Sequence, residues 1–164
     1  MAKSLKITLA QLNPIVGDVE ANKRMALEAW KDADSDLIIF SELFLSGYPP
    51  EDLVLKPFFI QKIEEAIASL QKESAKFKAA ALITCPWTRN DKIHNAAHLI
   101  DKGKIYATVF KHHLPNYSVF DEARTFTPGP MPNVIDFRGA KLGVMICEDM
   151  WTPSLSAELG KKGA

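Results

Sequence analysis

Residues 36–41 read Asp-Leu-Ile-Ile-Phe-Ser, a short and almost continuously apolar run. Such a run is typical of a strand that is buried on both faces of a sheet. Upstream, residues 5–12 (LKITLAQL) alternate so that Leu5, Ile7 and Leu9 share one face, which predicts a second strand. Two strands separated by about 25 residues leave room for one helical connection between them.

Helical patterns follow both predicted strands. Asp18 has the position of a helix N-cap, and apolar residues recur at helical spacing after it and again over residues 59–77. The remaining predicted elements are a buried strand at 79–84, hairpins at 96–111 and 134–147, and a helix that begins at Pro153. Strands alternating with helices indicate an α/β fold built in layers.

Composition narrows the class of protein. The chain has 164 residues, of which 47% are hydrophobic, and its 20 basic side chains balance its 20 acidic ones. These values predict one soluble domain and argue against nucleic-acid and membrane partners, because both usually require a basic surface. No apolar run approaches the ~18 residues of a membrane span, and no secretory signal is evident. Two cysteines, Cys85 and Cys147, fit a reducing, cytoplasmic compartment.

Three reactive or charged residues follow predicted strands: Glu42, Lys111 and Cys147. Ligands of α/β sheets bind at strand ends, so these side chains are candidates for one site. A thiol can attack a carbonyl carbon, a carboxylate can take its proton, and an ammonium group can stabilise the oxyanion. Together they describe acyl transfer from an amide or nitrile. The long irregular segment 111–132 is also typical of a functional loop.

Each of these residues also has a purely structural interpretation. A cysteine in an apolar strand is more often a buried hydrophobe, which is the interpretation we adopt for Cys85. A glutamate or lysine at a strand end is usually solvated, and spacing alone does not decide the matter. The four histidines lack partners at zinc-type spacing, so no metal site is predicted.

The residues around the three candidates resemble the motifs of a known family. Residues 41–52 (SELFLSGYPPED), 110–129 (FKHHLPNYSVFDEARTFTPG) and 143–151 (GVMICEDMW) are similar, in this order, to the Glu, Lys and Cys motifs of the nitrilase, or carbon–nitrogen hydrolase, superfamily. LPNYSVFDE and CEDMW resemble most the N-terminal glutaminase domain of the glutamine-dependent NAD synthetase family. The resemblance covers nearly the whole chain.

The resemblance implies a role for five residues. Glu42 is the general base, Lys111 stabilises the oxyanion, and Cys147 is the nucleophile that forms a glutamyl thioester. Tyr117 matches a tyrosine that contacts glutamine, and Glu122 matches an accessory carboxylate that orients the lysine. The family uses no metal and no other cofactor in this step.

The resemblance also implies an architecture and partners. The fold is an α-β-β-α sandwich, of which residues 1–164 match only the N-terminal part of the glutaminase domain. The ATP-dependent synthetase domain, with its ATP and Mg, is expected outside these residues, and no G-x-x-x-x-G-K-[ST] phosphate loop occurs here. The implied function is glutamine hydrolysis that supplies ammonia for NAD synthesis from deamido-NAD, with L-glutamine and the synthetase domain as partners. A homo-oligomer is expected for the full-length protein.

Two alternatives stay open at this point. One is a stand-alone amidase of the same superfamily that acts on another small amide. The other is an inactive fragment that only associates with intact subunits. Sequence beyond residue 164 distinguishes the first from the synthetase, and labelling of Cys147 by a glutamine-like electrophile tests the second.

Overall fold

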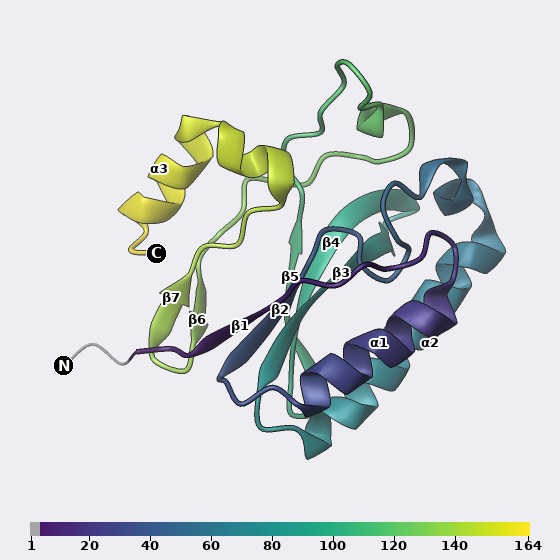
Figure 1. Cartoon of the computed structure of the whole chain (residues 1–164). Helices are drawn as coiled ribbons and strands as arrows, with labels where there is room; N and C mark the ends of the chain where they lie inside the picture. The colour runs from purple at the N-terminus through teal and green to yellow at the C-terminus, as the bar shows by residue number, and fades with distance from the viewer. Residues whose placement is uncertain (1–3) are drawn as a thin grey trace.

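The computed structural model describes residues 4–164 and is built on a five-stranded sheet of order β1-β2-β3-β4-β5 (Figure 1). Its strands are β1 (Ile7–Ala10), β2 (Leu37–Phe40), β3 (Ala80–Arg89), β4 (Lys92–Asp101) and β5 (Lys104–Phe110). The first three strands run parallel to one another. β4 pairs antiparallel with β3, and β5 pairs antiparallel with β4, so β5 runs in the same direction as β1–β3. The carboxyl ends of β1, β2 and β3 therefore meet at one edge of the sheet.

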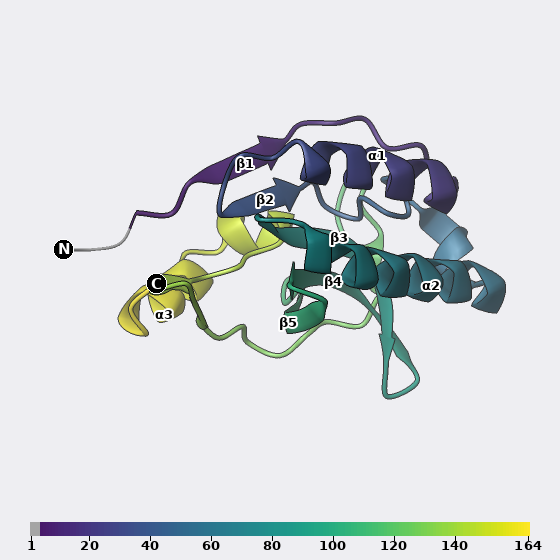
Figure 2. The same ribbon diagram turned by 90° about the horizontal axis from the view of Figure 1, so that it is seen from below.

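Helices α1 (Val19–Lys31) and α2 (Pro57–Glu73) pack side by side on one face of this sheet (Figures 1 and 2). Asp18 caps α1 as predicted, because its side chain accepts the Ala21 N–H at 3.0 Å. Trp30 at the end of α1 is fully buried, and its Nε1 donates to the carbonyl of Ala79 at 2.8 Å. This face holds the larger apolar core, to which Cys85 belongs.

The other face is covered in part by a hairpin, β6 (Ile135–Phe137) and β7 (Ala140–Leu142), and by the chain that follows it. The last helix, α3 (Pro153–Lys161), begins at the predicted proline. Four 3₁₀ segments complete the elements: η1 (Glu51–Leu55), η2 (Ser74–Lys76), η3 (Glu122–Arg124) and η4 (Cys147–Trp151).

The predicted α/β class is confirmed, with two local differences. β3 runs to Arg89 and turns back through Asn90 and Asp91, both with positive φ, to form a hairpin with β4 that the sequence pattern did not predict. The strand predicted at 141–147 ends at Leu142, because the chain turns away before Cys147.

The face of β1 predicted to be apolar lies largely open. Leu9 is 74% exposed and Ile7 46% exposed, and Ile7 lines an apolar groove with residues 141–145. The family resemblance predicts an α-β-β-α sandwich with two sheets. In the described residues the first sheet has five strands, and the second consists of the hairpin β6–β7. No helix in the described part of the chain is long and apolar enough to cross a membrane.

Candidate active site

Lys111 is the first residue after β5, and the main chain holds it on both sides. Its N–H donates to the carbonyl of Asn95 at 2.9 Å, and its carbonyl accepts the Gly129 N–H at 2.7 Å. Gly129 cannot be replaced by a larger residue without movement, because an added Cβ would lie 2.4 Å from the Cβ of Phe110. The side chain of Lys111 is fully buried, which contradicts the solvent-facing interpretation of this residue.

Two carboxylates share the Lys111 ammonium group. Nζ donates to Glu42 Oε1 at 2.7 Å and to Glu122 Oε1 and Oε2 at 2.7 and 2.9 Å. The Glu42 and Glu122 side chains are only 15% and 9% exposed. A buried cation between two anions is held by charge-assisted hydrogen bonds, and the set carries one net negative charge when all three groups are ionised.

The segment after β2 brings Glu42 to this position. Leu43 has φ 52°, a left-handed conformation that is uncommon for leucine, and it turns the chain immediately after Glu42. Thr84 of β3 then anchors the segment, since its hydroxyl donates to the carbonyl of Ser41 and accepts the Phe44 N–H at 3.0 Å. Thr84 therefore holds the main chain on both sides of Glu42, at Ser41 and at Phe44.

Cys147 begins η4 with φ 46°, another left-handed conformation at a residue other than glycine. Strained backbone of this kind clusters at active sites when its surroundings hold it in place. Asp149 supplies that restraint: it is fully buried, Oδ2 accepts the Ile146 N–H at 3.1 Å, and Oδ1 accepts the N–H groups of His112 and His113 at 3.1 and 2.8 Å. One carboxylate thus ties the turn of Cys147 to the chain that follows Lys111.

Tyr117 lies at the exposed rim of the site and is 56% exposed. Its hydroxyl donates to both carboxylate oxygens of Glu148 at 3.0 and 3.1 Å, and this hydrogen bond raises the pKa of Tyr117. Glu148 follows Cys147 in the chain, so this hydrogen bond links the segment after Lys111 to the segment of Cys147.

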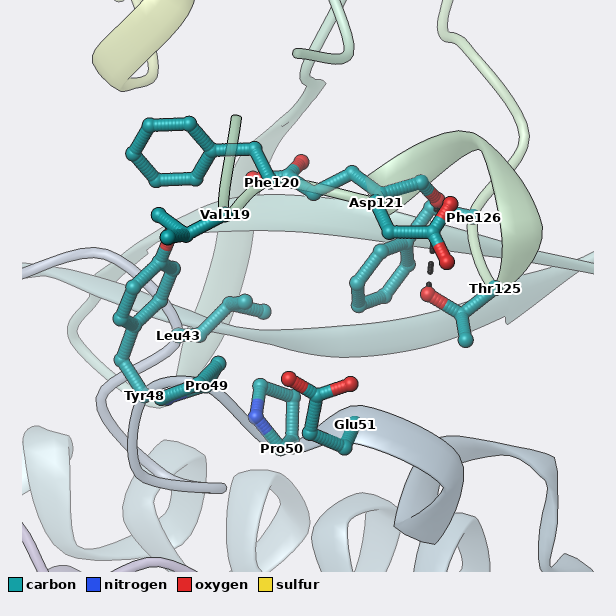
Figure 3. A pocket seen from close by; sticks show the side chains of 11 residues that line it. Leu43, Tyr48, Pro49, Pro50, Glu51, Val119, Phe120, Asp121, Thr125 and Phe126 are labelled. Carbon is teal, nitrogen blue, oxygen red and sulfur yellow. Dashed lines mark hydrogen bonds between the residues drawn. The ribbon is translucent and has the colours of Figure 1, made fainter. Parts of the chain in front are cut away.

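Glu122 also lines a small cleft, which Figure 3 shows from close by. Residues 48–51 form one wall, and residues 119–122 together with Thr125 and Phe126 form the other. Arg124 joins the two walls through ion pairs with Glu51, Asp52 and Asp121. The cleft has a volume of about 40 Å³, which is small beside the ~300 Å³ of a typical small-ligand site.

Residues 6–164 match the carbon-nitrogen hydrolase family. The chain belongs to this family. It is 42% identical over 151 residues to the glutamine-dependent NAD(+) synthetase of Aquifex aeolicus, covering 91% of the chain and 26% of the relative. It is 41% identical over 165 residues to the enzyme of the same name from Thermotoga maritima, covering 97% of the chain and 28% of the relative.

Solved structures agree with this carbon-nitrogen hydrolase assignment. The structure of glutamine-dependent NAD+ synthetase from Acinetobacter baumannii matches with a TM-score of 0.91 at 36% identity, over 97% of this chain and 30% of that one. A nitrilase-superfamily amidase from Nesterenkonia matches at 22% identity with a TM-score of 0.88, which shows the same fold. The chain spans less than a third of the length of the synthetases it matches.

Burial and the neighbouring charges together set the protonation state of the Cys147 thiol. Burial, followed by the charge of Glu42, raises the pKa of Cys147 to about 11, although Lys111 acts against this shift. Burial alone would lower the pKa of Lys111, but the two carboxylates outweigh it and raise that pKa. Burial raises the pKa of Glu122, with Lys111 and Asn95 opposing the shift. At neutral pH Cys147 is therefore in its protonated thiol form.

Three residues of the site were not identified from the sequence: Asn95, Glu148 and Asp149. Asn95 is fully buried on β4, and its Nδ2 donates to Glu42 Oε1 at 2.8 Å. Asn95 lies directly before the apolar strand predicted from residue 96, and this position is the signal that could have identified it, because an amide that a strand carries into the core requires partners. Conversely, the predicted Glu42, Lys111, Cys147 and Glu122 all contribute to one charged cluster. Among residues 4–164, no group of three His, Cys, Asp or Glu side chains is arranged to hold a metal ion.

Proposed function

We propose that this carbon-nitrogen hydrolase releases ammonia from the side-chain amide of L-glutamine and that the ammonia serves NAD synthesis from deamido-NAD. The observation that carries the proposal is the buried Lys111, shared between Glu42 and Glu122 in the same charged cluster as Cys147. This arrangement provides a nucleophile, a base and an oxyanion donor, which is the set that amide hydrolysis requires. The relatives named glutamine-dependent NAD(+) synthetase support the substrate and the use of the product.

The first half-reaction begins when Cys147 Sγ attacks the amide carbon while its proton passes to Glu42. The carbonyl oxygen becomes an oxyanion, which the Lys111 ammonium group stabilises. Collapse of the tetrahedral intermediate breaks the C–N bond, and Glu42 returns the proton to the leaving nitrogen, so ammonia departs and a glutamyl thioester remains.

The second half-reaction follows the same path with water as the nucleophile. Glu42 takes a proton from the water, which attacks the thioester carbon. The C–S bond then breaks, Glu42 returns the proton to Sγ, and glutamate leaves with the Cys147 thiol restored. The amide step needs no metal and no other cofactor; ATP and Mg belong to the synthetase domain.

The rim of the site suits a free amino acid. Glu148 provides a carboxylate for an α-ammonium group, and Tyr117 holds that carboxylate in place. A simple aliphatic amide lacks the ammonium group, so this pair favours glutamine over such substrates. We assign Tyr117 to substrate binding on this basis, and Glu122 to orienting Lys111.

The proposal includes the partners of the chain. Residues 1–164 form part of the glutaminase domain, and the ATP-dependent synthetase domain of the full-length protein receives the ammonia. The protein acts in the cytoplasm as a homo-oligomer.

Two variants of the full-length protein test the function. Cys147→Ala is expected to abolish glutamine-dependent NAD synthesis and to leave ammonia-dependent synthesis intact. Cys85→Ala, at a cysteine buried in the helix-side core, is the matched control and is expected to keep both activities. Retention of glutamine use by Cys147→Ala would contradict the proposal.

Two further experimental outcomes would favour the alternative functions, a stand-alone amidase or an inactive fragment. Ammonia release from glutamine or another small amide without any NAD synthesis would indicate a stand-alone amidase. An absence of Cys147 labelling by a glutamine-like diazoketone, measured by mass spectrometry, would indicate an inactive fragment.

A further inference from the structure

Asn95 connects two members of the proposed catalytic set. Its main-chain carbonyl accepts the Lys111 N–H at 2.9 Å, and its side-chain Nδ2 donates to Glu42 Oε1 at 2.8 Å. It lies on the same face of β4 as Ala97 and Leu99, which belong to the core beneath the Cys147 turn. The side chain is fully buried and therefore has one fixed environment.

The amide of Asn95 can be oriented in only one way. Its Oδ1 is buried and accepts no hydrogen bond from any residue between 4 and 164. Rotation of the amide would place Oδ1 against the Glu42 carboxylate, where two acceptors repel each other. The orientation that directs an N–H of Asn95 at Glu42 therefore leaves Oδ1 buried without a partner. Unsatisfied buried groups of this kind are rare in native proteins and require an explanation.

The hydrogen bonds that Lys111 and Asn95 donate to Glu42 end on the same oxygen. Lys111 Nζ lies 2.7 Å from Oε1 and Asn95 Nδ2 lies 2.8 Å from it, whereas neither group donates to Oε2. Two donors on Oε1 lower its basicity relative to Oε2. They also prevent the carboxylate from rotating, because rotation would break both bonds at once.

We propose that Asn95 is a positioning residue that, together with Lys111, reserves Oε2 of Glu42 as the atom that takes the proton of Cys147. The inference rests on the proposed role of Glu42 as the base. In the reaction the proton moves from Sγ to Oε2 and then to the leaving nitrogen, while the Asn95 and Lys111 hydrogen bonds stay on Oε1. Without Asn95, the carboxylate is less stabilised in its ionised form and can present either oxygen to the thiol.

The charged surroundings of Glu42 define what the pH dependence reports. The titratable groups that face it are Lys111, Glu122, Cys147 and Tyr48. Cys147 and Tyr48 ionise only at high pH, since burial raises their pKa values to about 11 and about 12. A change in the low-pH limb of Cys147 reactivity therefore reports on the carboxylates and not on these two groups.

The experiment measures alkylation of Cys147 by iodoacetamide from pH 4.5 to 9, together with glutamine hydrolysis, in the full-length protein. Asn95→Leu removes the donor and the unpartnered oxygen at nearly constant volume. We expect both rates at pH 7 to fall about ten- to hundredfold, with the loss in kcat and not in KM, because one charge-assisted hydrogen bond is lost. The low-pH limb is expected to move upward by about one pH unit.

Two comparisons separate positioning from structure. Asn95→Leu is expected to stay within about 1 kcal/mol of the wild-type unfolding free energy, because removal of an unsatisfied buried oxygen offsets the loss of the hydrogen bond to Glu42. His98→Gln, on the same strand but bonded to Thr108, is expected to lose stability and to keep the wild-type low-pH limb. Folded Asn95→Leu with wild-type rates and a wild-type limb would overturn the proposal.

Asn95→Asp provides a second test if the leucine variant does not fold. The new carboxyl group shares a proton with Glu42, so the low-pH limb is expected to move further than in Asn95→Leu. An unchanged limb in Asn95→Asp would equally overturn the proposal. Glu42→Gln tests the role of Glu42 separately from the role of Asn95. Wild-type reactivity in that variant would show that Glu42 is not the base, whatever the Asn95 variants do.

Discussion

The ammonium group of Lys111 lies 2.7 Å from Glu42 Oε1 although the two residues are 69 positions apart in the chain. Lys111 is fully buried, so its charge depends on Glu42 and Glu122 for compensation. The same ammonium group is the proposed oxyanion donor. Stability and catalysis therefore depend on one side chain.

Replacement of Lys111 by methionine tests this double role. We expect glutaminase activity to fall at least a hundred- to a thousandfold, as for the loss of an oxyanion donor. We also expect lower stability at pH 8, because Glu42 and Glu122 would face each other without a cation. Since protonation of one carboxyl relieves that repulsion, the stability deficit should shrink at pH 5, which urea unfolding at the two pH values measures. An equal deficit at both pH values would contradict this interpretation.

Glu122→Gln separates orientation of Lys111 from its charge. The variant keeps the Lys111–Glu42 pair but places an amide against Nζ, so we expect kcat to fall about tenfold or more. Burial and Glu42 contribute most to the raised pKa of Cys147, and Glu122 adds to them. Removal of its charge should therefore shift the alkaline rise of Cys147 alkylation to lower pH. Glu51→Gln, on the exposed wall of the small cleft, is the matched control and should change neither quantity.

The sequence predicted the parts of the site that follow from strand ends. Glu42 and Lys111 meet because each follows a strand of one sheet, and periodicity is sufficient to identify such strands. Periodicity also predicted the buried faces of α1 and α2, and Asp18 was predicted as the N-cap of α1. Glu122 and Tyr117 required the family resemblance, because both lie on an irregular loop where side-chain direction does not follow from any period.

Other features depend on long-range contacts and were not predictable from local patterns. The left-handed turn at Cys147 exists because Asp149 accepts N–H groups from a segment more than 30 residues away. The β3–β4 hairpin turns at Asn90 and Asp91, which resemble ordinary polar loop residues. The predicted apolar face of β1 gave no indication that Leu9 would lie open, because periodicity reports amphipathicity but not which element covers a face.

His98 makes stability dependent on pH at a distance from the site. It is buried, its Nδ1 lies 2.9 Å from Thr108 Oγ1, and burial lowers its pKa to about 4. The unfolded chain takes up a proton near pH 6.5, whereas the folded protein resists protonation until about pH 4. The stability that His98 provides by staying neutral in the folded protein is therefore fully present above pH 6.5. About 3 kcal/mol of folding free energy is lost as the pH falls toward 4.

Comparison with His98→Gln isolates this effect. The glutamine is neutral at every pH, so we expect the difference in unfolding free energy between wild type and variant to narrow from pH 7 to pH 4. Denaturant unfolding at half-unit pH intervals measures it. A difference that stays constant over this range would show that His98 does not carry the effect.

Asp149→Ala tests whether one buried carboxylate links the nucleophile turn to the lysine segment. Three N–H groups, of Ile146, His112 and His113, lose their acceptor. Unsatisfied buried donors cost about 1–3 kcal/mol each, so we expect a loss of at least about 3 kcal/mol of unfolding free energy. We also expect Cys147 alkylation to slow, because the left-handed backbone at that residue loses its restraint.

The neighbouring Glu148→Ala is the matched comparison for this prediction. Within residues 4–164, the Glu148 carboxylate accepts only from the exposed Tyr117 hydroxyl, so its removal should leave stability within about 0.5 kcal/mol of wild type. It should raise KM for glutamine, because the proposed partner of the α-ammonium group is gone, and should leave iodoacetamide alkylation unchanged. If Asp149→Ala behaved like Glu148→Ala in the unfolding experiment, the three hydrogen bonds to Asp149 would not hold the turn. The two adjacent carboxylates therefore separate support of the backbone from recognition of the substrate.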